Sequence, residues 1–424
     1  MKRAMNMLRA DIRELARPNK PLTKADYVLL CLMTAAALLC LREGAASQAG
    51  SVSFGYLNRQ FLNFYEYAAA CGMTEISYMP AVYLIYAVWN LPLKLTFLVR
   101  YPMPVVPYYV LLWYKLLPVL LSLSCAYLVY RIALEAGMGG KKAKLCALAS
   151  YTMPLGFFLQ FSYGEVMLMP LFFMLLGFWY YLRDRRWGFV LSYAAAVACQ
   201  QYVLVLFVPL VLLKEKRLRG LLENLLAAVL PFTLEYLLYR RSNGFRQHVE
   251  LFDIQADFAA GMYNGIFVIE YVMLLWIVLL GWAYFTNVRG KKELTASALF
   301  FIGLAGAVTL CLTDWRAEYF MLLVPFSVLL SFLHRDIRIF LLLDMAWGVL
   351  FIIYSYCERA LPDSLNMAAS LYTALVLAIA VFKHPRFLAE RPDELFRGYA
   401  GYIRVRYLCS AALCMGVAAG LMLY

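Results

Sequence analysis

Lys115 is a cation inside an apolar stretch of the chain, about two helical turns from where that stretch begins. A charge at that depth in a membrane costs enough free energy that a function is its default explanation. The alternative is that the long side chain reaches back to the water at the membrane surface. Glu165 stands in a short polar turn that we expect at the same end of the molecule. It could form an ion pair with Lys115, or it could cap the helix that it begins.

Five arginines stand in segments that we expect outside the cytoplasm, against the usual distribution of basic residues. A guanidinium group binds phosphate through two parallel N–H bonds, so one or two of these side chains are candidates for holding a phosphate. For any single one of them, a solvated surface position is the alternative. These residues are Arg59, Arg240, Arg241, Arg246 and Arg316.

The composition requires a membrane to position these groups. Of the 424 residues, 64% are apolar and 15% are charged, and the mean hydropathy is +0.69. Soluble proteins are roughly half apolar and a quarter charged, so an ordinary soluble domain is excluded. The net charge of +13 is a signal of topology, because membrane proteins keep Lys and Arg in cytoplasmic loops. It does not imply a nucleic acid partner.

The sequence contains no metal-ligand motif such as CxxC or HExxH, and its 3 histidines lie far apart. We therefore expect no metal and no other cofactor, with a divalent cation as an open alternative.

We predict an all-α, polytopic membrane protein with about 11 full transmembrane helices, because each apolar block of about 20 residues can cross a bilayer. The basic segment 1–25 is expected in the cytoplasm, and 26–335 is expected to form the main transmembrane module, with a long external loop at 44–106. The C-terminal part, 336–424, adds further spans and a cytoplasmic interfacial segment at 383–404. The predicted spans are 26–43, 107–131, 145–162, 166–182, 220–239, 266–286, 294–313, 318–333, 337–356, 364–382 and 405–422.

Two further apolar blocks do not fit a simple crossing. If 78–99 crossed, the basic loop at 139–144 would lie outside, so we expect 78–99 to be an amphipathic or re-entrant part of the external loop. The block 188–213 has basic runs at both ends. Two half-helices that meet near Gln200 and Gln201 would keep both runs inside.

Four segments, taken in order, resemble polytopic glycosyltransferases of the GT-C class. The segment 78–86 resembles their aromatic and proline segment in the first external loop, and 113–118 resembles the basic-Leu-Pro start of their second span. The turn at 161–166 is similar to the turn between their third and fourth spans, and 315–326 is similar to a late segment with Glu and Pro. The resemblance is one of order and topology over roughly 26–335.

This resemblance implies an inverting transfer of a sugar from a polyprenyl phosphate donor to a glycan, lipid or protein acceptor at the outer face of the cell membrane. A carboxylate would take the proton of the acceptor hydroxyl, and a cation would stabilise the departing phosphate. Members keep the acid in the first external loop, so Glu66 is the first candidate for the base, with Glu165 as the second catalytic carboxylate. The alternative for Glu66 is a surface carboxylate on an amphipathic loop helix. The candidates for substrate binding are Lys115, Arg59, Tyr78, Arg246, Arg316 and Glu318.

The chain departs from the family at positions that are often charged in its members. The neutral residues at these positions are Asn63, Met167, Gln200 and Gln201. Either Glu66 and Glu165 have taken over the acid roles, or the protein binds lipid or glycan without turning it over. A transporter or lipid flippase is a third class, but it predicts an internal repeat and paired broken helices, and only one broken helix is predicted here.

Overall fold

The computed structural model describes residues 23–39, 45–71, 78–96, 106–152, 165–248, 265–312 and 321–333, and every regular element within these ranges is a helix. The prediction of an all-α protein is therefore confirmed for this part of the chain. In chain order the elements are α2 (Lys24–Leu39), α3 (Ala45–Val52), α4 (Phe54–Leu57), α5 (Phe64–Ala70), α6 (Pro80–Leu95), α7 (Tyr108–Glu135), α8 (Gly140–Tyr151), the 3₁₀ turn η2 (Glu165–Met167), α10 (Leu168–Leu182), α11 (Arg186–Cys199), α12 (Val203–Lys214), α13 (Leu218–Tyr239), α14 (Asn243–His248), α16 (Gly265–Phe285), α17 (Lys291–Leu312) and α18 (Val324–Leu333).

Within the described residues, three helices are long and apolar enough to cross a membrane. They are α7, the continuous helix formed by η2 and α10, and α13, and they coincide with the predicted spans 107–131, 166–182 and 220–239. The full set of about 11 spans stays a prediction. Outside the described residues lie most of segment 1–25, the predicted spans 337–356, 364–382 and 405–422, and the interfacial segment 383–404.

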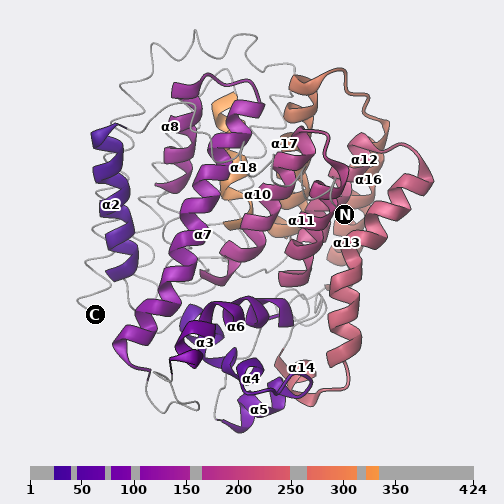
Figure 1. Ribbon diagram of the computed structural model, residues 1–424. Coiled ribbons are helices and arrows are strands. Elements are labelled where there is room, and N and C mark those ends of the chain that lie inside the picture. The colour runs from indigo at the N-terminus through magenta and orange to yellow at the C-terminus, as the bar shows by residue number, and fades with distance from the viewer. Residues whose placement is uncertain are drawn as a thin grey trace, which may run out of the picture.

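Helix α10 forms the centre of a helical bundle. It is apolar on all sides, so it must be surrounded by other helices, and both Phe178 and Trp179 are fully buried. It packs against α7 on one side and α11 on the other, while α12 connects the bundle to α16 and α17 (Figure 1). Gly177 allows α11 to come close, because a Cβ there would lie 2.5 Å from Cδ2 of Tyr193.

The apolar block 188–213 is broken where the sequence predicts it. Helix α11 ends at Cys199, Gln200 has an extended backbone, and α12 begins at Val203. Lys214 at the end of α12 forms an ion pair with Asp184, just before α11, so both basic runs lie at the same end of the bundle. The half-helix pair is thus confirmed as a pair of helices.

The basic segment at 139–144 is not the loop that we predicted. All three of its lysines belong to the beginning of α8, which starts at Gly140. Lys and Ala favour helix formation, and the Nζ atom of Lys144 lies 2.6 Å from Oδ2 of Asp26 at the start of α2. This ion pair places the first turns of α2 and α8 side by side.

The described part of the predicted external loop, 45–71 and 78–96, contains four helices, α3 to α6, which we call the first-loop layer. The layer lies across one end of the bundle in Figure 1, and it contacts α7, η2 and α11. Helix α6 buries one face and exposes the other, which is apolar. The buried face is mainly apolar as well, so the amphipathic or re-entrant segment stays a prediction. The exposed apolar residues of α6 are Leu84, Val88, Leu91 and Leu95.

Candidate functional site

Lys115 and Glu165 form a buried ion pair at the junction of α7, η2 and the first-loop layer. The side chains are only 1% and 2% exposed, so the explanation that Lys115 reaches back to water is wrong. The second carboxylate oxygen, Oε2, accepts a hydrogen bond of 2.9 Å from the backbone N–H of Ala46 at the start of α3. The predicted pairing is confirmed, and the pair fastens the layer to the bundle.

Helix α3 can lie directly on α7 because of Gly50. A Cβ at this position would stand 2.7 Å from Cδ1 of Tyr114, so no larger residue fits without a shift. The Nδ2 atom of Asn90 on α6 donates hydrogen bonds of 3.0 Å to the Gly50 carbonyl and to the Ser53 hydroxyl. These contacts order α3 and α6 above the ion pair.

Tyr86 of α6 brings a buried hydroxyl close to the ion pair. The hydroxyl makes no hydrogen bond with any described residue. Burial raises the pKa of Tyr86, and the negative charge of Glu165 raises it further, with a smaller contribution from Tyr78. Tyr86 therefore adds a neutral O–H group beside the two charges. The sequence offered no signal for this role beyond an aromatic residue in the first loop.

Glu66 lies in a second polar group, between α5 and α14. Its Oε1 accepts a hydrogen bond from the hydroxyl of Ser242, which also accepts one of 3.0 Å from the backbone N–H of Phe245. Burial raises the pKa of Glu66, but the hydrogen bond from Ser242 and the neighbouring backbone N–H groups outweigh it and lower the pKa below its usual value. Glu66 is thus an ionised carboxylate that ties α5 to α14.

Tyr65 connects these two groups. Its hydroxyl donates a hydrogen bond of 2.9 Å to the Tyr78 carbonyl, and the Tyr78 N–H donates one of 3.2 Å to the Tyr83 hydroxyl. Tyr78 is half-buried and also influences Tyr86 beside the ion pair. The predicted residues therefore fall into two neighbouring groups, with Lys115, Glu165 and Tyr78 in one and Glu66 in the other.

The arginines that we predicted as phosphate ligands do not lie together in the structure. Arg246 is exposed on α14, near Glu66, and its Nη2 donates a hydrogen bond of 2.6 Å to Oδ1 of Asn243. Arg59 is exposed in the turn after α4, with a left-handed backbone at φ 66. Arg316 and Glu318 lie outside the described residues.

Glu235 is a carboxylate that the sequence reasoning missed. It lies near the end of α13 that faces the first-loop layer, and its buried Oε2 makes no hydrogen bond with a described residue. Burial raises the pKa of Tyr56 in α4, the hydrogen-bonded Tyr239 raises it further, and Glu235 adds to this shift, so the carboxylate lies close to Tyr56. The signal was an acid deep inside the predicted span 220–239, whose other acid, Glu223, lies near the start of the span. An intramembrane charge is a functional candidate by default.

Within the described ranges, no group of three or more His, Cys, Asp or Glu side chains is arranged to hold a metal ion. No protein-family model matches the chain, and no curated protein or solved structure matches it either.

Proposed function

We propose that the protein is an integral membrane glycosyltransferase that moves a sugar from a polyprenyl phosphate donor to a glycan, lipid or protein acceptor at the outer face of the cell membrane. The observation that carries the proposal is the buried Lys115–Glu165 pair, which lies where the first-loop layer covers the end of the bundle. A buried charge pair stabilises a fold poorly compared with apolar packing, so its presence favours a function.

In this proposal Lys115 provides the cation for the donor's phosphate. An ammonium group has three N–H donors, and among the described residues only Glu165 accepts one. Two donors are therefore left for phosphate oxygens. The positive charge of Lys115 would stabilise the negative charge that develops on the phosphate as it departs. Glu165 holds the ammonium group in place and fastens α3 above it through Ala46.

Glu66 is the proposed base. Its lowered pKa keeps it ionised at neutral pH, so it can take the proton of an acceptor hydroxyl while that hydroxyl attacks the anomeric carbon. Arg246 on the adjacent α14 and the half-buried Tyr78 would bind the donor phosphate and a sugar ring, respectively.

The test uses membranes that contain the full chain, supplied with polyprenyl phosphate carrying a radiolabelled hexose or pentose, one sugar at a time. We expect the chain to release polyprenyl phosphate and to transfer label for at least one sugar. We expect Glu66→Gln to lower the transfer rate at least about 100-fold, as the loss of a general base does, without lowering the amount of folded protein.

Ser242→Ala is the matched control, because it removes the hydrogen bond to Glu66 but keeps the carboxylate. If Glu66 is the base, Ser242→Ala should retain most of the transfer rate. Equal losses in both variants would show that Glu66 only ties α5 to α14. If no sugar of the panel is transferred by the unaltered chain, the enzymatic proposal fails.

A further inference from the structure

Two groups at the buried ion pair have hydrogen-bond donors that no described residue uses. The Lys115 ammonium group has three N–H donors, and among the described residues only Glu165 accepts one. The hydroxyl of Tyr86 makes no hydrogen bond with a described residue. Water at the surface does not reach either group, because Lys115 is 1% exposed and Tyr86 is 0% exposed. The site therefore offers three unused donors.

The Tyr86 hydroxyl lies near Glu165 without binding it. Of the two carboxylate oxygens, Oε1 binds Lys115, and Oε2 accepts the hydrogen bond of 2.9 Å from the backbone N–H of Ala46. Burial raises the pKa of Tyr86 most, and the charge of Glu165 raises it further, so the hydroxyl lies within electrostatic range of the carboxylate. The hydroxyl stays protonated at neutral pH and can donate a hydrogen bond.

A buried hydroxyl without a partner costs free energy, because it gives up its hydrogen bonds to water and gains none. Phenylalanine would fill the same space without that cost. Buried polar groups in folded proteins are nearly always paired, so an unpaired one needs an explanation. A ligand that accepts a hydrogen bond from Tyr86 provides that explanation.

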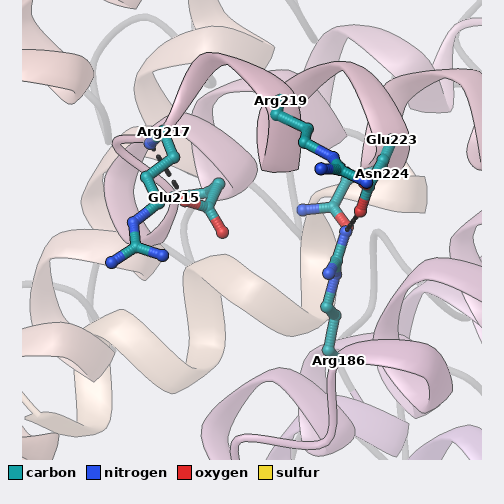
Figure 2. Close-up of polar contacts among 6 residues, drawn as sticks. All are labelled: Arg186, Glu215, Arg217, Arg219, Glu223 and Asn224. Carbon is teal, nitrogen blue, oxygen red and sulfur yellow. Dashed lines mark hydrogen bonds and ion pairs between the residues drawn. The ribbon is translucent and has the colours of Figure 1, made fainter.

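The polar cluster at the other end of α13, shown in Figure 2, is different. The Arg186 guanidinium group donates hydrogen bonds of 2.8 Å to Oδ1 of Asn224 and of 2.7 Å to Oε2 of Glu223. Arg219 donates one of 3.0 Å to the other carboxylate oxygen of Glu223. Arg186 and Arg219 thus have partners from the chain, and the cluster joins α11 to α13 without a ligand.

The unused donors favour an anion with several oxygens, because the ammonium group of Lys115 can only donate. Phosphate is such an anion. Glu165 already compensates the charge of Lys115, so the pair by itself attracts a phosphate only weakly. A further donor is therefore needed to hold the phosphate, and the Tyr86 hydroxyl supplies one.

From these observations we infer that Tyr86 binds the phosphate of the polyprenyl phosphate donor together with Lys115, an inference that rests on the proposed function. When the bond between the anomeric carbon and the phosphate oxygen breaks, its electron pair stays on that oxygen, and hydrogen bonds to the resulting charge strengthen. The acceptor oxygen bonds to the anomeric carbon, and its proton passes to Glu66. Because Lys115 and Tyr86 are both buried, entry of the donor requires α3 and α6 to move away from α7.

The experiment measures the binding of farnesyl phosphate and of farnesol to the purified full chain in neutral detergent by isothermal titration calorimetry. Farnesyl phosphate carries no sugar, so its binding does not depend on turnover. We expect it to bind more tightly than farnesol. Tyr86→Phe should weaken farnesyl phosphate binding about 10- to 100-fold, as the loss of one hydrogen bond to a charged group does, and should leave farnesol binding unchanged.

Tyr193→Phe is the matched control. Tyr193 on α11 also has a buried hydroxyl without a hydrogen bond to a described residue, but its ring packs against Phe189 and Phe207 inside the bundle. We expect this variant to bind farnesyl phosphate as the unaltered chain does. Both variants should unfold at a temperature no lower than the unaltered chain, because neither loses a hydrogen bond.

Equal farnesyl phosphate affinities in Tyr86→Phe and the unaltered chain would overturn the inference. Equal losses in Tyr86→Phe and Tyr193→Phe would do the same, and so would farnesyl phosphate binding no tighter than farnesol.

The kinetic constants for the sugar-loaded donor separate this inference from the proposed function. If Tyr86→Phe transfers sugar with unchanged kcat and KM, Tyr86 is not a ligand of the phosphate and the transferase stands. If the chain binds farnesyl phosphate through Tyr86 but transfers no sugar, the phosphate site stands and the transferase fails.

Discussion

Burial removes the water that would hydrate the charges of Lys115 and Glu165. The ion pair between them and the hydrogen bond from the backbone N–H of Ala46 replace that water. Removing one partner leaves the other charge buried without compensation, so we expect Lys115→Met and Glu165→Met each to destabilise the protein by about 3–5 kcal/mol. The double variant should be less destabilised than either single variant, because no lone charge is left. Thermal unfolding of the three proteins in detergent measures this, with Arg219→Gln as a control from an exposed ion pair that should barely change the midpoint. If the destabilisation of the double variant equals the sum of the two single destabilisations, the pairing is contradicted.

The contact between α5 and α14 depends on the charge of Glu66, so its strength should depend on pH. The folded state lowers the pKa of Glu66 from 4.5. Stabilisation of the docked helices is therefore complete above about pH 4.5 and is lost as the pH falls through the lower pKa of the docked state. Hydrogen exchange of peptides that cover 61–71 and 243–248 should accelerate over this range, relative to α10. In Glu66→Gln the acceleration should disappear, and an unchanged pH dependence would assign it to another group.

At the scale of the whole molecule, the two ends of the bundle should face opposite sides of the membrane. Cys71, directly after α5 in the first-loop layer, has a half-buried thiol, and Arg217 is exposed just before the start of α13, at the opposite end of that helix. A maleimide that cannot cross membranes should label intact cells at Cys71, measured as label that is lost in Cys71→Ser. In that background, Arg217→Cys should react only after permeabilisation. Labelling of Arg217→Cys in intact cells would reverse the orientation.

The sequence determined the properties that depend on local composition. Apolar length predicted the helices α7, α10 and α13, and the two basic runs with one apolar block between them predicted the break at Gln200. The pairing of Lys115 with Glu165 was one of the alternatives that the sequence left open, and the structure decided in its favour.

Only the tertiary structure decided the partners of the remaining polar groups. Glu66 meets Ser242 across 176 residues, and Tyr86 of α6 lies close enough to Glu165 for its charge to raise the pKa of the Tyr86 hydroxyl. Hydropathy and charge are properties of consecutive residues, so they indicate whether each segment contacts lipid or water. Which distant side chains meet depends on how close the helices come, and that is set by packing at positions such as Gly50 and Gly177, where one methyl group would change the fit.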